Sequence, residues 1–151
     1  MTKKESKIYV LHENESWVAP LFASFDELNV PYVDWFINDG RLNLEDVPPE
    51  GVFYNRMSAS AHSRSHRYAI ELTESILSWL EFHGRKVINN RHALTLEVRK
   101  SEQQLSLNRF GISTPKTVVV NNSKDLIQAA TELNLFPFIV KPNRGGKGLG
   151  V

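Results

Sequence analysis

The residues best suited to chemistry gather at the carboxyl end of this 151-residue chain. The stretch FPFIVKPNRGGKGLGV, residues 136–151, joins an apolar run to a loop with four glycines. Glycines let the backbone approach an anion closely, and successive N–H groups can surround phosphate oxygens. Arg144 and Lys147 add positive charge, and Lys141 ends the apolar run, where partial shielding would strengthen its attraction to phosphate. These residue types and their spacing predict a clamp for nucleotide phosphates.

Two familiar phosphate-binding patterns do not fit this loop. A P-loop requires serine or threonine after its Gly-Lys pair, but Gly148 follows Lys147. The dinucleotide-binding fingerprint follows an early strand, whereas Gly146, Gly148 and Gly150 alternate at the end of the sequence. From glycine content alone, a flexible turn with incidental basic residues is an equally good interpretation.

A second candidate site follows a predicted strand at residues 51–57. Asn55 and Arg56 lie near the end of this strand, and open α/β sheets bind ligands at the carboxyl edge. Because a guanidinium group binds a carboxylate through two hydrogen bonds, Arg56 is a candidate for contacting a substrate carboxylate. A structural ion pair of Arg56 is the alternative. His62 and His66 lie four residues apart, but no acidic residue completes a ligand set, so no metal site is predicted.

Hydrophobic periodicity predicts the elements that position these residues. We expect an α/β fold with an open, mostly parallel sheet over residues 1–90, followed by a second unit over residues 91–151. Ser16 and Ser123 are predicted helix N-caps. Trp17, Trp35 and Trp79 are predicted core residues. The predicted strands cover residues 7–13, 31–37, 51–57, 86–90, 114–120 and 136–142, and the predicted helices cover 15–30, 67–84, 91–112 and 123–134.

The composition narrows the possible partners. Eighteen basic residues face seventeen acidic ones, which gives no overall field that favours nucleic acid or an anionic membrane. No apolar segment approaches the roughly 20 residues that a membrane span needs. The sequence contains no cysteine and no apolar signal segment at its start, which predicts a cytoplasmic protein.

The stretch RKSEQQLSLNRFGISTPKTVVV, read together with FPFIVKPNRGGKGLGV about twenty residues later, resembles the ATP-grasp superfamily. It is most similar to the RimK-like α-L-glutamate ligases and their glutathione-synthetase relatives. In those enzymes a lysine near a long helix precedes Gly-Ile-x-x-Pro, a Val-Lys-Pro strand and a glycine-rich flap. The matching residues are Lys100, Gly111, Ile112, Pro115, Val140, Lys141, Pro142, Gly145, Gly146, Gly148 and Gly150.

The resemblance implies that ATP phosphorylates a carboxylate, which an amine then attacks to form an amide bond. Residues 1–90 would form a pre-ATP-grasp domain, and residues 91–151 a linker helix and the start of the small ATP-grasp lobe. Lys100 and Lys141 would contact the α- and β-phosphates, under a flap formed by Gly145, Gly146, Lys147 and Gly148. The resemblance implies that the magnesium ligands lie in a following lobe and not within residues 1–151.

We therefore expect the N-terminal portion of an ATP- and magnesium-dependent carboxylate–amine ligase, inactive alone. Its expected substrate is an amino-acid or peptide carboxylate. Apolar surface intended for the missing lobe would favour a homodimer. The alternative is a non-catalytic α/β module that binds a small molecule or a protein.

Overall fold

The computed structural model describes residues 6–145 and contains a four-stranded, all-parallel sheet. The strands lie in the order β2-β1-β3-β4, so the chain places β2 on one side of β1 and β3 on the other. The carboxyl ends of β1 and β3 therefore flank the topological switch point, where open parallel sheets bind ligands. The predicted parallel α/β sheet is confirmed. The strands are β1 (Lys7–His12), β2 (Tyr32–Phe36), β3 (Gly51–Asn55) and β4 (Lys86–Ile88).

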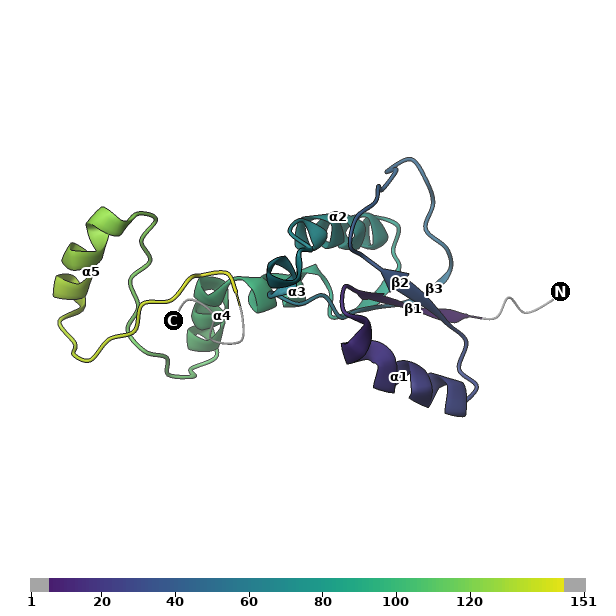
Figure 1. Ribbon diagram of the computed structural model, residues 1–151, viewed down its shortest axis with the longest axis horizontal. Coiled ribbons are helices and arrows are strands. Elements are labelled where there is room, and N and C mark those ends of the chain that lie inside the picture. The colour runs from purple at the N-terminus through teal and green to yellow at the C-terminus, as the bar shows by residue number, and fades with distance from the viewer. Residues whose placement is uncertain (1–5, 146–151) are drawn as a thin grey trace.

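Two helices cover opposite faces of the sheet, with α1 (Glu15–Glu27) below and α2 (Ala69–Phe82) above in Figure 1. The helical periodicity of α2 is confirmed, because its apolar stripe faces the core. Gly84 ends the turn after α2 with a φ of +66°, a conformation that favours glycine. The stripe that the sequence predicted to be buried consists of Ile70, Thr73, Leu77 and Leu80.

The main core lies between the sheet and α2, and it extends into α3 (Arg91–Val98). Leu94 and Val98 of α3 are buried in this core together with Leu11 and Phe53 of the sheet. Within the described part of the chain, no residue after Val98 is buried. A domain boundary near residue 90 stays a prediction, but the packing of the first unit includes α3.

The details of α1 differ from the prediction. Asn14, not Ser16, is the N-cap, and the Ser16 hydroxyl donates a hydrogen bond to Asn14 Oδ1 at 2.7 Å. Val18 is the buried residue of this helix, whereas Trp17 is 41% exposed and Leu28 is 71% exposed. Trp17 is therefore not a core residue. Its ring stacks with a guanidinium group instead, as described below.

The predicted helix over residues 91–112 is two helices, α3 and α4 (Lys100–Arg109). The break falls at Arg99, whose φ of −114° and ψ of 106° are extended. A new helix leaves its first N–H groups without internal acceptors. Asn143 supplies two acceptors: its carbonyl accepts from Lys100 N at 3.1 Å, and its Oδ1 accepts from Ser101 N at 2.9 Å.

The structure assigns no strand to residues 114–120 or to residues 136–142, so the two strands predicted there are wrong. Both are apolar, but a strand also requires a hydrogen-bonded neighbour. A short 3₁₀ helix η2 (Ser123–Asp125) and α5 (Leu126–Leu133) lie between them. Ser123 is not the cap, because the Asn122 side chain accepts the hydrogen bonds from Lys124 N and Asp125 N. The start of an α+β ATP-grasp lobe, predicted over residues 91–151, therefore stays a prediction, and the described part of this segment contains helices and extended segments.

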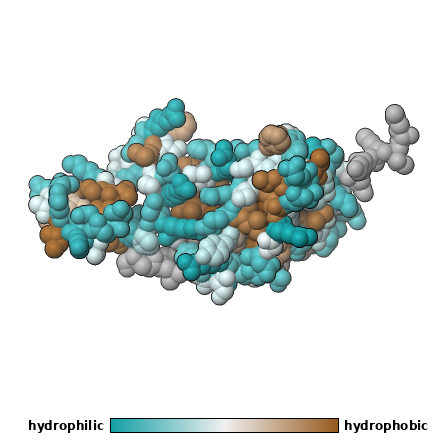
Figure 2. Space-filling model, turned by 90° about the horizontal axis from the view of Figure 1, so that it is seen from above, coloured by the Kyte–Doolittle hydropathy of each residue, from teal (hydrophilic) through white to brown (hydrophobic). Residues whose placement is uncertain are grey.

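Exposed apolar side chains are concentrated in this second part of the molecule. They include Phe136 at 77%, Ile139 at 75% and Ile127 at 81% exposure. Figure 2 shows hydrophobic surface at the end of the molecule that contains α5. No helix within residues 6–145 has the length and apolar character to cross a membrane.

Candidate functional site

The first candidate pocket lies among α4, α5 and the two extended segments, and its volume is about 180 Å³. Three lysines line it: Lys100 from the first turn of α4, Lys116 from one extended segment and Lys141 from the other. The structure therefore brings together Lys100 and Lys141, which lie far apart in the sequence. Apolar walls are formed by Val118, Val120, Leu126, Leu133, Phe138 and Val140.

The amino end of α4 holds the beginning of the glycine-rich stretch. Lys100 Nζ donates hydrogen bonds to the carbonyl oxygens of Gly145 at 2.7 Å and Asn143 at 3.4 Å. Together with the two backbone bonds to Asn143, these contacts fix residues 143–145 against the helix. The Lys100 ammonium group thus lies where the predicted flap starts. Gly145 is the last described residue of that flap, and Gly146, Lys147 and Gly148 lie outside the described residues.

Arg144 attaches the same segment to α2. Its guanidinium donates two hydrogen bonds to Glu71, Nη1 to Oε1 at 2.7 Å and Nη2 to Oε2 at 3.3 Å. The hydrogen bond from Arg144 lowers the pKa of Glu71, and the same contact raises the pKa of Arg144. Arg144 was predicted to add charge to a phosphate clamp, but here its charge is paired with Glu71.

The second candidate pocket lies at the carboxyl edge of the sheet and has a volume of about 330 Å³. It is lined by the loop after β3, by α3 and by Trp17. Asn55 is buried at its floor, where Nδ2 donates to the Asn89 carbonyl at 2.9 Å and Oδ1 accepts from Met57 N at 3.0 Å. Asn89 Nδ2 donates back to the Asn55 carbonyl at 3.1 Å. Asn55 therefore braces two strand ends.

Arg56 is exposed at the rim of the second pocket. Its guanidinium lies 5.7 Å from the centre of the Tyr54 ring, and it makes no ion pair within residues 6–145. The structural ion pair considered from the sequence is absent from this described region. A guanidinium held by a ring and open to solvent can bind an incoming carboxylate.

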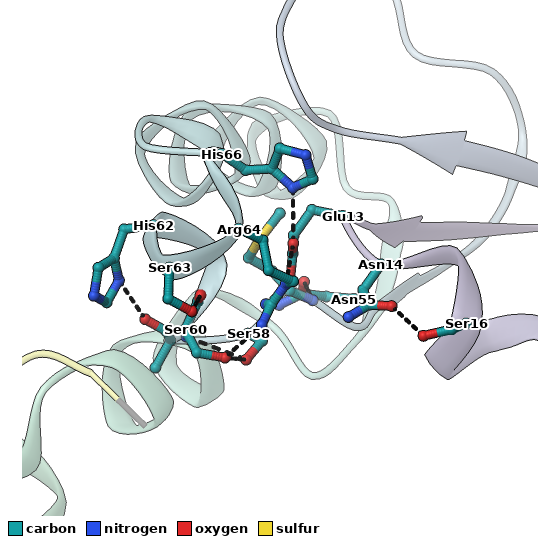
Figure 3. Close-up of polar contacts among 12 residues, drawn as sticks. Glu13, Asn14, Ser16, Asn55, Ser58, Ser60, His62, Ser63, Arg64 and His66 are labelled. Carbon is teal, nitrogen blue, oxygen red and sulfur yellow. Dashed lines mark hydrogen bonds and ion pairs between the residues drawn. The ribbon is translucent and has the colours of Figure 1, made fainter. Parts of the chain in front are cut away.

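A buried ion-pair cluster beside this pocket was not anticipated from the sequence (Figure 3). Glu13 follows β1 and is only 2% exposed. It pairs with Arg64 of the 3₁₀ helix η1 (Ala61–Arg64), whose Nε donates to Glu13 Oε2 at 3.0 Å and whose Nη2 binds Oε1. His66 Nδ1 lies 2.9 Å from Glu13 Oε2. The Arg64 guanidinium also lies 4.8 Å from the centre of the Trp17 ring.

The charge of Glu13 is set by opposing effects. Burial alone would raise the pKa of Glu13, but hydrogen bonds and charge from Arg64 and His66 outweigh it, so the pKa is lowered. Glu13 is thus a carboxylate that fixes the loop after β3 to the end of β1. The sequence placed Glu13 at the end of the predicted strand 7–13, but it could not indicate the partner Arg64, which is 51 positions away.

His12 is a second buried polar residue at this edge. Its Nε2 lies 2.6 Å from Asp34 Oδ1, and the ring packs edge-on against Phe22 and Phe36. Its Nδ1 is buried and has no hydrogen-bond partner among the described residues. The contacts connect β1 to β2, and they lie on the face of the sheet that α1 covers.

The comparisons with known proteins give no family: no family model matches the chain, and no curated protein matches it. The ATP-grasp resemblance therefore stays a prediction that depends on the motif residues.

Proposed function

We propose that the chain is the nucleotide-binding portion of an ATP-dependent carboxylate–amine ligase of the ATP-grasp type. The observation that carries the proposal is the meeting of Lys100 and Lys141 at one pocket, beside the start of the glycine-rich stretch. A pocket with apolar walls and three lysine side chains suits a nucleotide, because the walls can cover a base while the positive charges bind phosphates.

The residues of the first pocket fit part of an ATP molecule. Lys100 now binds carbonyl oxygens, and a phosphate oxygen would make a stronger, charge-assisted hydrogen bond with the same ammonium group. When bound, ATP would supply the phosphoryl group that activates a carboxylate. Lys100 and Lys141 would hold its phosphates and offset their charge.

Magnesium does not fit the described donor groups. Within residues 6–145 there is no cluster of three or more histidine, aspartate or glutamate side chains that could hold a metal ion. We therefore assign no residue of this segment to magnesium and no step of the reaction to it. The cytoplasmic location also stays a prediction from the sequence.

Calorimetric titration with ATP in the presence of magnesium tests this proposal. Lys100→Ala and Lys141→Ala should each weaken binding by about tenfold, which corresponds to the loss of about 1.4 kcal/mol. Lys124→Ala is the matched control, because Lys124 is exposed and does not line the pocket. Equal ATP affinities of the wild type and both pocket variants would refute the proposal, as would an equal loss in the control.

The alternative, a non-catalytic module, is favoured by one observation. The second pocket is built from residues 17–97, so it does not require the lysines of the first pocket. Binding of a small acid without any binding of ATP would support the module and contradict the ligase.

A further inference from the structure

Residues 143–145 occupy the positive end of α4 with acceptors of their own. Lys100 N donates to the Asn143 carbonyl at 3.1 Å, and Ser101 N donates to Asn143 Oδ1 at 2.9 Å. Lys100 Nζ donates to the Gly145 carbonyl at 2.7 Å. A helix N-terminus and an ammonium group are donors that phosphate oxygens also use. The segment therefore engages the same donors that the proposed nucleotide site would offer to phosphate.

Arg144 links this segment to a different helix. Its guanidinium donates to both carboxylate oxygens of Glu71, in the first turn of α2, at 2.7 Å and 3.3 Å. The pair lies in a groove of about 420 Å³ that residues of α2 and α4 line together. Arg144 stands between Asn143 and Gly145 in the chain. The pair with Glu71 therefore helps to hold both carbonyl groups that Lys100 binds.

Several features indicate that this attachment can be released. Arg144 Nε is buried and has no hydrogen-bond partner within residues 6–145, and a buried donor without an acceptor costs free energy. Gly145 has a φ of +134°, a conformation that glycine tolerates and other residues rarely adopt. The side chains of Glu71 and Arg144 are 46% and 39% exposed, so solvent screens their attraction. The attached state is therefore held by a small difference in free energy.

We propose that residues 143–145 form an autoinhibitory latch that competes with phosphate groups for Lys100. Glu71 is its positioning residue, because it acts through Arg144. In the closed state two carbonyl oxygens take the place of phosphate oxygens on the ammonium group. In the released state the ammonium group and the first N–H groups of α4 are available to a phosphorylated ligand. The identity of that ligand rests on the proposed function, whereas the latch rests on the hydrogen bonds themselves.

Amide hydrogen exchange of the whole chain, followed by NMR, tests the latch without any ligand. The N–H groups of Lys100 and Ser101 have no acceptor within α4, so the closed latch is what protects them. Glu71→Gln and Arg144→Gln should each raise these exchange rates about threefold, which corresponds to about 0.6 kcal/mol. The double variant should show the same threefold increase, because both changes remove one interaction, whereas an increase of about ninefold would show independent effects and overturn the role of the pair.

Further variants separate the latch from changes of charge or of overall stability. Glu74→Gln removes the same charge from the same groove, but Glu74 forms no ion pair within the described chain, so the exchange rates should not change. Gly145→Ala changes no charge but disfavours the positive φ, so it should raise the rates about fivefold or more. Exchange at Leu77, which is buried in the core, should stay constant. An equal increase at Leu77 would show general destabilisation and overturn the inference.

Binding of inorganic tripolyphosphate at constant ionic strength tests the competition for Lys100. Glu71→Gln and Arg144→Gln should each bind this anion about threefold more tightly than the wild type, whereas Glu74→Gln should bind it equally. The result for Arg144→Gln is the sharpest, because the loss of a positive charge would otherwise weaken the binding of an anion. Weaker binding by Arg144→Gln, equal binding by all variants or no binding at all would overturn the inference.

Calorimetric titration with ATP distinguishes the failure of this inference from the failure of the proposed function. Faster exchange and tighter tripolyphosphate binding in the latch variants, without binding of ATP to any of them, would reject the nucleotide site and retain the latch. Binding of ATP that is weakened by Lys100→Ala but is equal in the wild type, Glu71→Gln and Arg144→Gln would retain the proposed function and reject the latch.

Discussion

The replacement Glu13→Gln should destabilise the fold more than any ordinary surface substitution. Glu13 is a buried carboxylate that accepts two contacts from Arg64 and one from His66. Glutamine has nearly the same shape but no charge, so it leaves the Arg64 guanidinium, whose side chain is only 21% exposed, without a counterion. Breaking one partner of a buried ion pair costs about 3–5 kcal/mol. Because Arg64 retains some solvent contact and its bond to Ser60, we expect the lower figure, about 3 kcal/mol.

This loss is a large part of a typical folding free energy of about 5–15 kcal/mol. For a chain of this size it corresponds to a decrease in Tm of about 6–12 °C. Urea denaturation followed by circular dichroism measures the free energy of unfolding directly. The matched control is Glu50→Gln, because Glu50 pairs with Arg85 at 2.9 Å but its side chain is 68% exposed.

The ion pair between the exposed Glu50 and Arg85 should contribute less than about 1 kcal/mol to the free energy of unfolding. If the two variants were destabilised equally, burial would not be what makes the Glu13 cluster strong, and the reasoning would be refuted. A Glu13→Gln variant as stable as the wild type would refute it as well.

Three further predictions concern pH, backbone geometry and assembly. Because the pKa of Glu13 is lowered in the folded state, its stabilisation is present above the unfolded pKa, about 4.3, and is lost as pH falls through the folded pKa. The free energy of unfolding should therefore fall less steeply in acid for Glu13→Gln than for the wild type, and parallel pH profiles would contradict this. Gly51→Ala should lower stability by about 1–3 kcal/mol more than Gly40→Ala in urea denaturation. Both glycines have positive φ, but only at Gly51 would a Cβ meet the Lys7 carbonyl, at 2.5 Å, so equal losses would count against the steric argument. The exposed apolar side chains of residues 112–140 should make the chain dimerise at high concentration, which light scattering would disprove by showing a monomer throughout.

The parallel sheet and α2 could be predicted because their signals are local. Apolar residues at helical spacing placed Ile70, Leu77 and Leu80 on one face, and short β-branched runs gave the strands of the sheet. The runs at residues 118–120 and 138–140 have the same character, yet they form no strands. β-propensity reports a fit to a pleated surface, and it cannot supply the neighbouring strand.

Local sequence signals could not predict the contacts that build the candidate sites. The cap of α4 comes from Asn143, which lies 42 positions after Ser101. The partner of Glu13 lies 51 positions away, and Asn55 binds the Asn89 carbonyl across 34 positions. The sequence proposed Lys100 and Lys141 from a motif and Arg56 from its place at a strand end. It could not show that Asn55 braces the fold or that Arg144 pairs with Glu71.

The helix break at Arg99 explains how neighbouring residues can belong to two different pockets. Glu97 and Lys100 are three positions apart, and in one continuous helix they would lie on the same face as a favourable ion pair. The extended conformation of Arg99 ends α3 and starts α4 in a new direction. Glu97 then lines the pocket at the sheet edge, while Lys100 lines the pocket beside the glycine-rich stretch. An unbroken helix would let these two charges neutralise each other, so the break keeps a carboxylate for one pocket and an ammonium group for the other.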